Sequence, residues 1–434
     1  MTAKAYTKIK KLIKSEGKLF AGSGLLTIIR LGSGLILLKI TALIGGNSAV
    51  AIYGQAQNIV SMVNGILASG VGEGVVKMTA QNQNDSSKIN LIKSASILLV
   101  SLCTLFIIFI SSIFWTIFID WASLGNFTRL QITIYIFGGL FASFGTLLIS
   151  LANGFQLLNE VVKINIFSIF ASLTITGLFF FLNGDSVIIV IPAIYLGIIG
   201  IFQMGILIKK IQLPTNILSQ IDFNTINQLG GFMIMAIGSF IMTPVALVTI
   251  RGWLIQDYGA NFTGDWESSR KLLELVTALL TAYFAMVLLP KLAKISDLKV
   301  LRVEIINNAI ALMILSFISL VFLYIFRNQV YYIIFSAEFS FSSELMSSRA
   351  IGEFLRSLTW IFGFIMIVKA RVKLYLSTSF FYMFILLCSS WFMIDNYGII
   401  GANYAYIVSN SIMLLVSLII FYNITLDSYT EPKS

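Results

Sequence analysis

The chain has 434 residues, of which 58% are hydrophobic and only 11% are charged. A soluble chain carries about 25% charged residues, so this composition excludes a soluble globular protein and indicates a polytopic membrane protein. Lys and Arg outnumber Asp and Glu by 29 to 19. In a membrane protein such an excess is expected first in cytoplasmic loops, and we expect no nucleic-acid partner. The chain has no histidine, so proton coupling would have to use carboxylates.

Hydropathy predicts twelve membrane-spanning helices. Their approximate residues are 19–43, 49–76, 91–115, 130–153, 162–182, 186–208, 229–250, 268–290, 305–326, 347–368, 374–394 and 398–423. With both termini in the cytoplasm, 20 of the 29 Lys and Arg lie on the cytoplasmic side and 6 on the opposite side. Because Lys and Arg near span ends set the orientation, we predict cytoplasmic termini.

A second copy of the opening stretch is found when the sequence is shifted by about 214 residues, which places Lys77 on Lys291. Six spans in each half then predict two pseudo-symmetric lobes, 1–212 and 213–434, around a central cavity. The predicted fold class is therefore an all-α polytopic membrane protein.

Helix breakers predict the bends between and within spans. Turn-forming residues at 45–47, 183–185 and 396–398 separate apolar runs and indicate tight corners. Pro244 lies inside the seventh span, where it removes a backbone donor. We expect Pro244 to bend or interrupt that helix.

Arg30 lies near the middle of the first predicted span. A cation at the centre of a spanning helix costs about 2.5–3.5 kcal/mol on insertion scales. Ser23, Thr27 and Gly34 share its helical face and are small or polar. We therefore predict that Arg30 faces a cavity; the alternative is an interior cation paired with a helix carbonyl.

Two pairs of opposite charges have helical i, i+4 spacing. Arg270 and Glu274 can pair on one face, and Glu274 is a candidate for binding a coupling H+ or Na+ or else part of a surface ion pair. Glu73 and Lys77, at the end of the second span, form a candidate gate or a local pair. All four are predicted coupling or gating residues.

A third group of charges lies in the tenth span. Arg349, Glu353 and Arg356 share one face by the same spacing. Two cations around one carboxylate leave a positive charge for an anion, although a purely structural triad fits the pattern equally well.

Several short motifs in order carry a resemblance to a known family. They are Lys39-x-x-Ala42-x-x-Gly45-Gly46, GVVKMTAQ ending at Gln81, Asn153-Gly154-Phe155, Pro244-Val245-Ala246 followed by Arg251, Trp266 with Glu274, GEFLR ending at Arg356, and Gly398-x-x-Gly401-Ala402. With these motifs the chain resembles the Wzx-type O-antigen translocases and lipid III flippases of the multidrug/oligosaccharidyl-lipid/polysaccharide exporter superfamily. Gln57 departs from the Arg expected in the lipid III branch.

The resemblance implies a MATE-like exporter fold and a flippase rather than an enzyme. Such a protein moves an undecaprenyl-diphosphate-linked oligosaccharide from the cytoplasmic to the periplasmic leaflet of a bacterial inner membrane. It serves lipopolysaccharide or other surface polysaccharide synthesis. The implied partners are that lipid-linked sugar, membrane lipids, and polysaccharide polymerase and chain-length proteins; no cofactor is implied beyond H+ or Na+ coupling.

The cargo calls for two kinds of side chain. Arginine holds diphosphate oxygens through charge-assisted hydrogen bonds, and sugars need hydroxyl and amide partners. The predicted substrate-binding residues are Arg30, Lys39, Gln57, Ser61, Asn64, Arg251, Arg356, Asn403 and Asn410. For Lys39 and Arg251, anchoring at the level of the lipid headgroups is an equally good interpretation.

Two other function classes stay open. A drug or metabolite antiporter of the same superfamily would more often keep acidic residues within its spans, whereas Arg30 is the prominent mid-span charge here. A membrane polymerase or ligase acting on lipid-linked sugars usually carries a large periplasmic loop, and this sequence predicts none.

Overall fold

The computed structural model describes the backbone of residues 3–121, 128–183, 188, 190–214, 222–283, 288, 292, 295, 297–335, 342–369 and 371–426. Every secondary-structure element formed by these residues is a helix. Nine helices of this described part are long and apolar enough to cross a membrane. The prediction of an all-α, multi-pass membrane protein is therefore confirmed.

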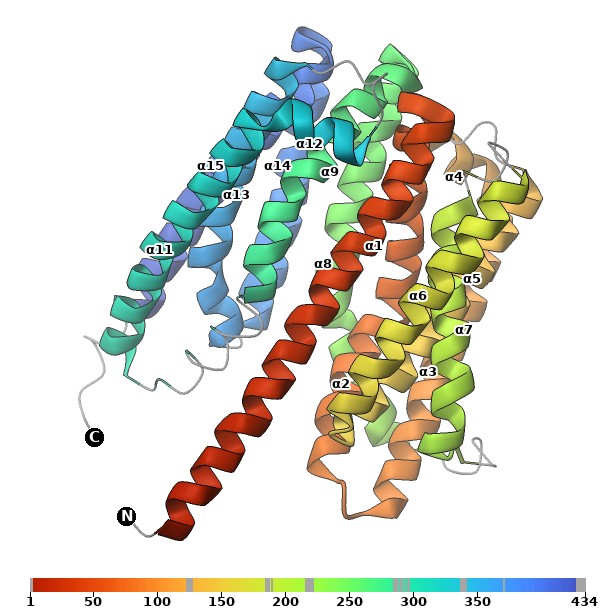
Figure 1. Ribbon diagram of the computed structural model, residues 1–434, viewed down its shortest axis with the longest axis vertical. Coiled ribbons are helices and arrows are strands. Elements are labelled where there is room, and N and C mark those ends of the chain that lie inside the picture. Colours follow the sequence, from red (N-terminus) through yellow and green to blue (C-terminus); the bar gives the residue numbers. More distant parts are fainter. Residues whose placement is uncertain are drawn as a thin grey trace. The chain divides into compact units, whose positions relative to one another are not determined.

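Helix α1 (Ala3–Asn64) contains the first predicted span and the start of the second. Between them Gly46 adopts φ 61° and ψ −153°, and the chain reverses direction there (Figure 1). This left-handed conformation suits glycine because it has no Cβ. The second span continues through a π-helical turn, η1 (Gly65–Ser69), into α2 (Gly70–Gln81). The corner predicted at 45–47 is confirmed.

One compact unit comprises residues 1–37, 59–118 and 126–241. Its further helices are α3 (Ser86–Ile113), most of α4 (Trp115–Trp121), α5 (Arg129–Gly154), α6 (Leu158–Asn183) and α7 (Ile191–Ile211). Helix α5 packs closely against α7, and a Cβ on Gly200 would lie 2.0 Å from the Phe141 carbonyl oxygen. Glycine is therefore required at this crossing.

The second compact unit comprises residues 38–58, 119–125 and 242–434. Its helices are the end of α8 (Phe223–Tyr258), then α9 (Ala260–Tyr283), α11 (Leu298–Ile325), α12 (Arg327–Ile334), α13 (Ser343–Val368), α14 (Val372–Tyr397) and α15 (Ile399–Leu426). Helix α13 packs against α9, α11 and α15. Each compact unit is assembled from three segments of the chain. The division into two lobes, 1–212 and 213–434, remains a prediction.

Two corners in the second unit also depend on glycine. Gly259, between α8 and α9, has φ 83°, and Gly398, between α14 and α15, has φ 68°. The corner at 396–398 is thus confirmed, whereas the one at 183–185 falls largely outside the described residues. Helix α8 continues through Pro244, so Pro244 does not interrupt the helix; the bend expected there remains a prediction.

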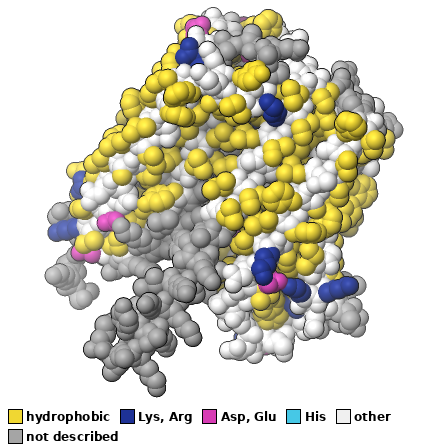
Figure 2. All heavy atoms as spheres, in the orientation of Figure 1, with side chains coloured by type: hydrophobic (Ala, Val, Ile, Leu, Met, Phe, Trp, Pro, Cys, Tyr) yellow, Lys and Arg dark blue, Asp and Glu magenta, His cyan; other side chains and the backbone are white. Residues whose placement is uncertain are grey.

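The surface is dominated by apolar side chains. In Figure 2 hydrophobic residues cover much of the described face, and large side chains such as Phe106, Phe181 and Trp391 are exposed. Such a surface is stable against lipid acyl chains rather than water. It supports assignment to a membrane.

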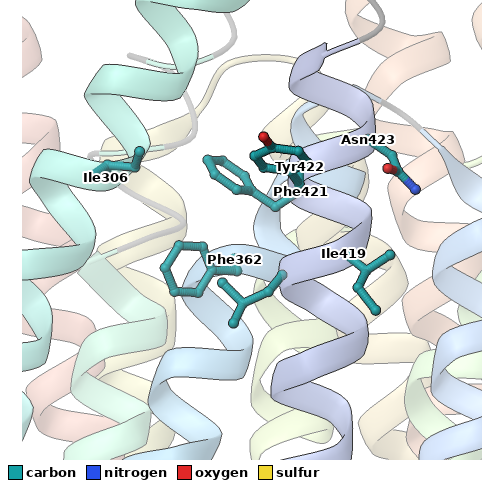
Figure 3. A pocket seen from close by; sticks show the side chains of 7 residues that line it. Ile306, Phe362, Ile419, Phe421, Tyr422 and Asn423 are labelled. Carbon is teal, nitrogen blue, oxygen red and sulfur yellow. The ribbon is translucent and has the colours of Figure 1, made fainter.

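An apolar groove of about 600 Å³ lies among α11, α13 and α15 (Figure 3). Ile306, Phe362 and Phe421 are among its lining residues, and Asn423 supplies the one amide. Because none of its lining side chains is charged, the groove does not suit an anionic headgroup.

Candidate functional site

Eight charged side chains gather inside the second unit, on helices α8, α9 and α13. We call them the charge cluster: Arg251, Glu267, Arg270, Lys271, Glu274, Arg349, Glu353 and Arg356. Five of the eight side chains are at most 2% exposed. Withdrawing charges from water costs several kcal/mol per ion unless they are paired and hydrogen-bonded. The ion pairs and hydrogen bonds inside the cluster therefore determine which charged side chains are left to bind a ligand.

Glu267 bridges two arginines at the centre of the cluster. Its Oε2 accepts from Arg251 Nη2 and Arg270 Nε, both at 2.8 Å, and its Oε1 accepts from Arg270 Nη2 at 2.7 Å. Arg251 Nη1 also donates to Gln55 Oε1 at 2.6 Å. Arg251 is fully buried, so this predicted substrate-binding residue is held within the protein interior.

Glycine on α1 makes room for this carboxylate. A Cβ on Gly54 would lie 2.3 Å from Glu267 Oε1. Gly54 thus lets the backbone of α1 lie directly against the ion pair, and Gln55 beside it supplies the amide that reaches Arg251.

Glu353 organises the other side of the cluster. Its Oε1 accepts from Arg349 Nε and Nη2 at 3.1 and 2.7 Å and from the Tyr406 hydroxyl at 3.0 Å. Its Oε2 accepts from Thr277 Oγ1 at 2.6 Å. The Arg349 guanidinium also lies 3.7 Å from the centre of the Tyr406 ring. Four hydrogen bonds therefore fix this buried carboxylate.

Three side chains form the accessible edge of the cluster: Lys271, Glu274 and Arg356. Glu274 is 32% exposed and Arg356 is 22% exposed, while Lys271 is half-buried and donates to the side-chain oxygen of Gln57. Glu274 Oε2 accepts from Arg270 Nη1 at 2.9 Å, as the i, i+4 spacing predicts.

Arg356 is bound more loosely than the other arginines. Its Nη1 lies 3.9 Å from Glu274 Oε1 and 3.9 Å from Glu353 Oε1, too far for a hydrogen bond to either carboxylate. The same Nη1 donates to the Tyr406 hydroxyl at 3.2 Å. A guanidinium that is partly exposed and weakly paired keeps donors for an external anion.

The formal charge of the cluster favours an anion. Five cations face three carboxylates, which leaves a net charge of +2 in a largely buried site. Low dielectric surroundings strengthen the attraction of such a site for a negative group. The arrangement can therefore hold a phosphate-like ligand at the edge formed by Lys271 and Arg356.

Asn403 and Asn410 support the helices around the cluster. Asn403 accepts from Trp266 Nε1 at 3.0 Å and donates to the Leu345 carbonyl oxygen and Ser348 Oγ at 2.9 and 3.0 Å. Asn410 is buried and donates to the Tyr406 carbonyl oxygen at 2.8 Å. Both amides hydrogen-bond within the unit; their contact with sugar remains a prediction.

Arg30 lies in the first unit, away from the charge cluster in sequence. Its side chain is exposed, and its Nη2 donates to Asn165 Oδ1 at 2.9 Å. Gln203 Nε2 donates to the same oxygen at 3.1 Å. Asn165 thereby orients one edge of the guanidinium.

Lys39 caps the short helix α12. Its ammonium donates to the carbonyl oxygens of Ile333, Phe335 and Tyr332 at 2.6, 3.3 and 3.4 Å. Cations are favourable at helix C-termini because the exposed carbonyls carry partial negative charge. A role for Lys39 in substrate binding remains a prediction.

The remaining predicted residues lie in the first unit. Ser61 is exposed and Asn64 is half-buried. Glu73 and Lys77 are both exposed on α2, and Lys77 Nζ lies 5.5 Å from the centre of the Phe232 ring. Their predicted roles in sugar binding and gating stay predictions.

Sequence reasoning missed Glu267 and Gln55. Glu267 falls one residue before the predicted span 268–290, so it was not recognised as a buried charge. Its i, i+3 spacing to Arg270 was the signal available. Its bond to Arg251 connects α8 and α9 and could not be found from periodicity.

Comparison with known proteins gives two kinds of relative. Two lipid III flippases, from Escherichia coli (strain K12) and Shigella flexneri, are each 22% identical over 402 residues, covering 88% of this chain and 92% of theirs. A solved inward-facing multidrug-resistance MATE family transporter of the MOP superfamily is 13% identical, with a TM-score of 0.75, covering 94% of this chain and 96% of that one. No family model matches the chain.

These relatives bear on the predictions made from sequence. The fold is that of MATE transporters, as predicted. The likeness to the flippases extends over most of both chains, and these relatives are transporters rather than enzymes. The two curated relatives agree with the resemblance to lipid III flippases, and the solved structure agrees with the expected MATE-like fold.

Proposed function

We propose that this chain, a multi-pass membrane protein with the fold of MOP-superfamily transporters, is a flippase for a lipid-linked oligosaccharide. The cargo is an undecaprenyl-diphosphate-linked sugar unit, moved from the cytoplasmic to the periplasmic leaflet of a bacterial inner membrane. The unit belongs to O-antigen or a similar surface polysaccharide. Both termini lie in the cytoplasm, as the distribution of Lys and Arg indicates.

The observation that carries the proposal is the accessible edge of the charge cluster. Arg356 and Lys271 present cationic donors there, and the cluster as a whole has a net charge of +2. A diphosphate diester carries two negative charges, and the planar guanidinium of Arg356 matches phosphate oxygens well. A site of this sign repels the organic cations that many multidrug transporters carry.

The relatives support the same cargo class. The two curated relatives are named lipid III flippases, and the present chain matches them over 88% of its length. Gln57 receives a hydrogen bond from Lys271, so the position at which the resemblance expects Arg lies at the accessible edge. We propose that glutamine in place of this arginine tunes the site for a different sugar-diphosphate. Arg30, in the first unit, is proposed separately as a contact for the diphosphate.

Complementation in a strain that lacks its own O-antigen flippase tests the proposal. Wild type should restore surface polysaccharide. Arg356→Gln should reduce it about tenfold or more, and Arg356→Lys should restore only part of it because a bidentate contact is lost. Arg302→Gln is the matched control, since Arg302 lies over the Tyr422 ring, 5.0 Å from its centre, outside the cluster.

The complementation experiment also distinguishes a flippase from a multidrug antiporter. If wild-type protein reaches the membrane but restores no surface polysaccharide, and if it increases resistance to cationic drugs, the protein is a multidrug antiporter rather than a flippase. A normal amount of surface polysaccharide from a well-expressed Arg356→Gln variant would show that the diphosphate headgroup does not bind at the charge cluster.

A further inference from the structure

Glu274 occupies an unusual place for a carboxylate in an anion-binding site. It lies at the accessible edge of the charge cluster with two partly exposed cations: Lys271, three residues before it on α9, and Arg356, whose Nη1 is 3.9 Å from Glu274 Oε1. We propose that Glu274 is a built-in competitor of the anionic cargo: its carboxylate occupies the cationic edge in the empty protein and weakens binding of the diphosphate. This inference rests on the proposed function and adds a residue that sets the affinity of the site.

The other two carboxylates of the cluster cannot play this part. Glu267 and Glu353 are fully buried and accept three and four hydrogen bonds, respectively. Glu267 is hydrogen-bonded to Arg251 and Arg270, and Glu353 to Arg349, and these three arginines are at most 2% exposed. Of the three, Glu274 alone is partly exposed, at 32%.

The contacts of Glu274 are asymmetric. Its Oε2 is held by Arg270 Nη1 at 2.9 Å, whereas its Oε1 lies 3.9 Å from Arg356 Nη1. Arg270 is buried and also bonded to Glu267. Glu274 is therefore anchored on its inner side, while its outer oxygen faces Arg356 without a hydrogen bond. A phosphate oxygen can take this position beside Arg356 without breaking a strong contact.

Competition of this kind suits a transporter. A net charge of +2 in a largely buried site would hold a diphosphate tightly, and a cargo bound too tightly is released slowly. A fixed negative charge beside the ligand lowers its affinity and returns to the cations when the ligand leaves. Glu274 thereby makes binding reversible without reducing the number of cations that recognise the headgroup.

Binding of UDP-N-acetylglucosamine to the purified full-length protein in lipid nanodiscs tests the inference. This soluble probe contains a diphosphate diester attached to a sugar. Glu274→Gln should bind it about five- to tenfold more tightly than wild type, because a charge in direct contact with the site is removed. Glu274→Asp keeps the charge on a shorter side chain and should lie between the two.

Two further variants complete the experiment. Arg356→Gln should bind the probe at least about fivefold more weakly. Glu344→Gln removes a carboxylate from the exposed first turn of the same helix, α13, and should change the affinity less than about twofold. A structural defect at Glu274 would weaken binding, so a gain in affinity distinguishes competition from a general loss of structure.

The outcomes are distinct. Tighter binding by Glu274→Gln, with slower delivery of lipid-linked sugar across proteoliposome membranes, supports the competitor. Unchanged or weaker binding by Glu274→Gln and Glu274→Asp, while Arg356→Gln still loses affinity, overturns it but leaves the anion site intact. Equal binding by wild type, Glu274→Gln and Arg356→Gln overturns both the competitor and the proposed headgroup site.

Discussion

Arg356 Nη1 lies 3.9 Å from Glu274 Oε1, whereas about two turns away on the same helix Arg349 Nη2 lies 2.7 Å from Glu353 Oε1. The inner pair is buried and the outer pair is partly exposed. Pairing in the charge cluster thus loosens from the interior toward its accessible edge. The inner pairs maintain the fold, and the outer residues remain free to exchange partners with a ligand.

Glu267→Gln should destabilise the second unit severely. The substitution leaves Arg251 and Arg270 buried with part of their charge uncompensated, and breaking a buried pair costs about 3–5 kcal/mol. We expect a lower free energy of unfolding in SDS titrations of the purified protein. Glu344→Gln, on an exposed surface, is the control and should be nearly neutral. Equal stability of both variants would contradict a structural role for Glu267.

Gly54→Ala should destabilise the protein by about 1–3 kcal/mol because the added methyl group overpacks the contact with Glu267. The Cβ would lie 2.3 Å from Glu267 Oε1. Gly177→Ala is a matched control in a helix where a Cβ would meet no atom within 4 Å. It should be neutral or stabilising by up to about 1 kcal/mol. Thermal unfolding of the two variants gives the comparison, and equal melting temperatures would rule out the tight contact.

The stability of the corner between α8 and α9 should depend on pH through Asp265, which precedes the predicted span 268–290. Burial raises the pKa of Asp265 from 3.8 to about 6, and Asn47 Nδ2 donates to its Oδ1 at 2.7 Å. Because the folded pKa exceeds the unfolded one, burying the charged carboxylate lowers stability above pH 6. This cost disappears as the pH falls toward 4.

Asp265→Asn should therefore melt at a higher temperature than wild type at pH 7.5, and the difference should shrink at pH 4.5. The amide keeps an oxygen that can accept from Asn47. Melting curves at several pH values between 4.5 and 7.5 measure this effect. A constant difference across that range would show that the charge of Asp265 is not responsible.

Lys39→Met should loosen the end of α12. The change removes an ammonium that donates to carbonyl oxygens at residues 332, 333 and 335. Favourable charges at helix ends contribute about 0.3–1 kcal/mol. Hydrogen exchange of the amides in α12 should become faster, by about two- to fivefold, whereas Lys77→Met, at an exposed position of α2, should leave it unchanged. Unaltered exchange in Lys39→Met would show that the cap does not stabilise α12.

Local pairs in the charge cluster could be predicted from sequence. Arg270 and Glu274 are four residues apart on one helix and form the expected ion pair. Arg349 and Glu353 do so as well. Helical periodicity fixes the relative direction of such side chains regardless of the surrounding fold, and the corner at Gly46 is similarly local because its backbone conformation requires glycine.

Contacts between helices could not be predicted in the same way. Arg251 reaches Glu267 and Gln55 from another helix, and their sequence positions give no sign of this proximity. The sequence contains Arg251 as a candidate for binding phosphate, whereas the packing of α8, α9 and α1 determines that it is enclosed. Burial and partner choice are tertiary properties, so the accessible members of the cluster emerge only from the structure.

The ammonium of Lys39 illustrates why a formal charge is a poor measure of electrostatic potential in a membrane protein. Three backbone oxygens at the negative end of α12 surround it, and their dipoles cancel much of the field that a distant phosphate would experience. The chain's formal charge of +10 therefore overstates its attraction for anions. The attractive potential is concentrated where a cation lacks close oxygen partners, as at the outer face of Arg356.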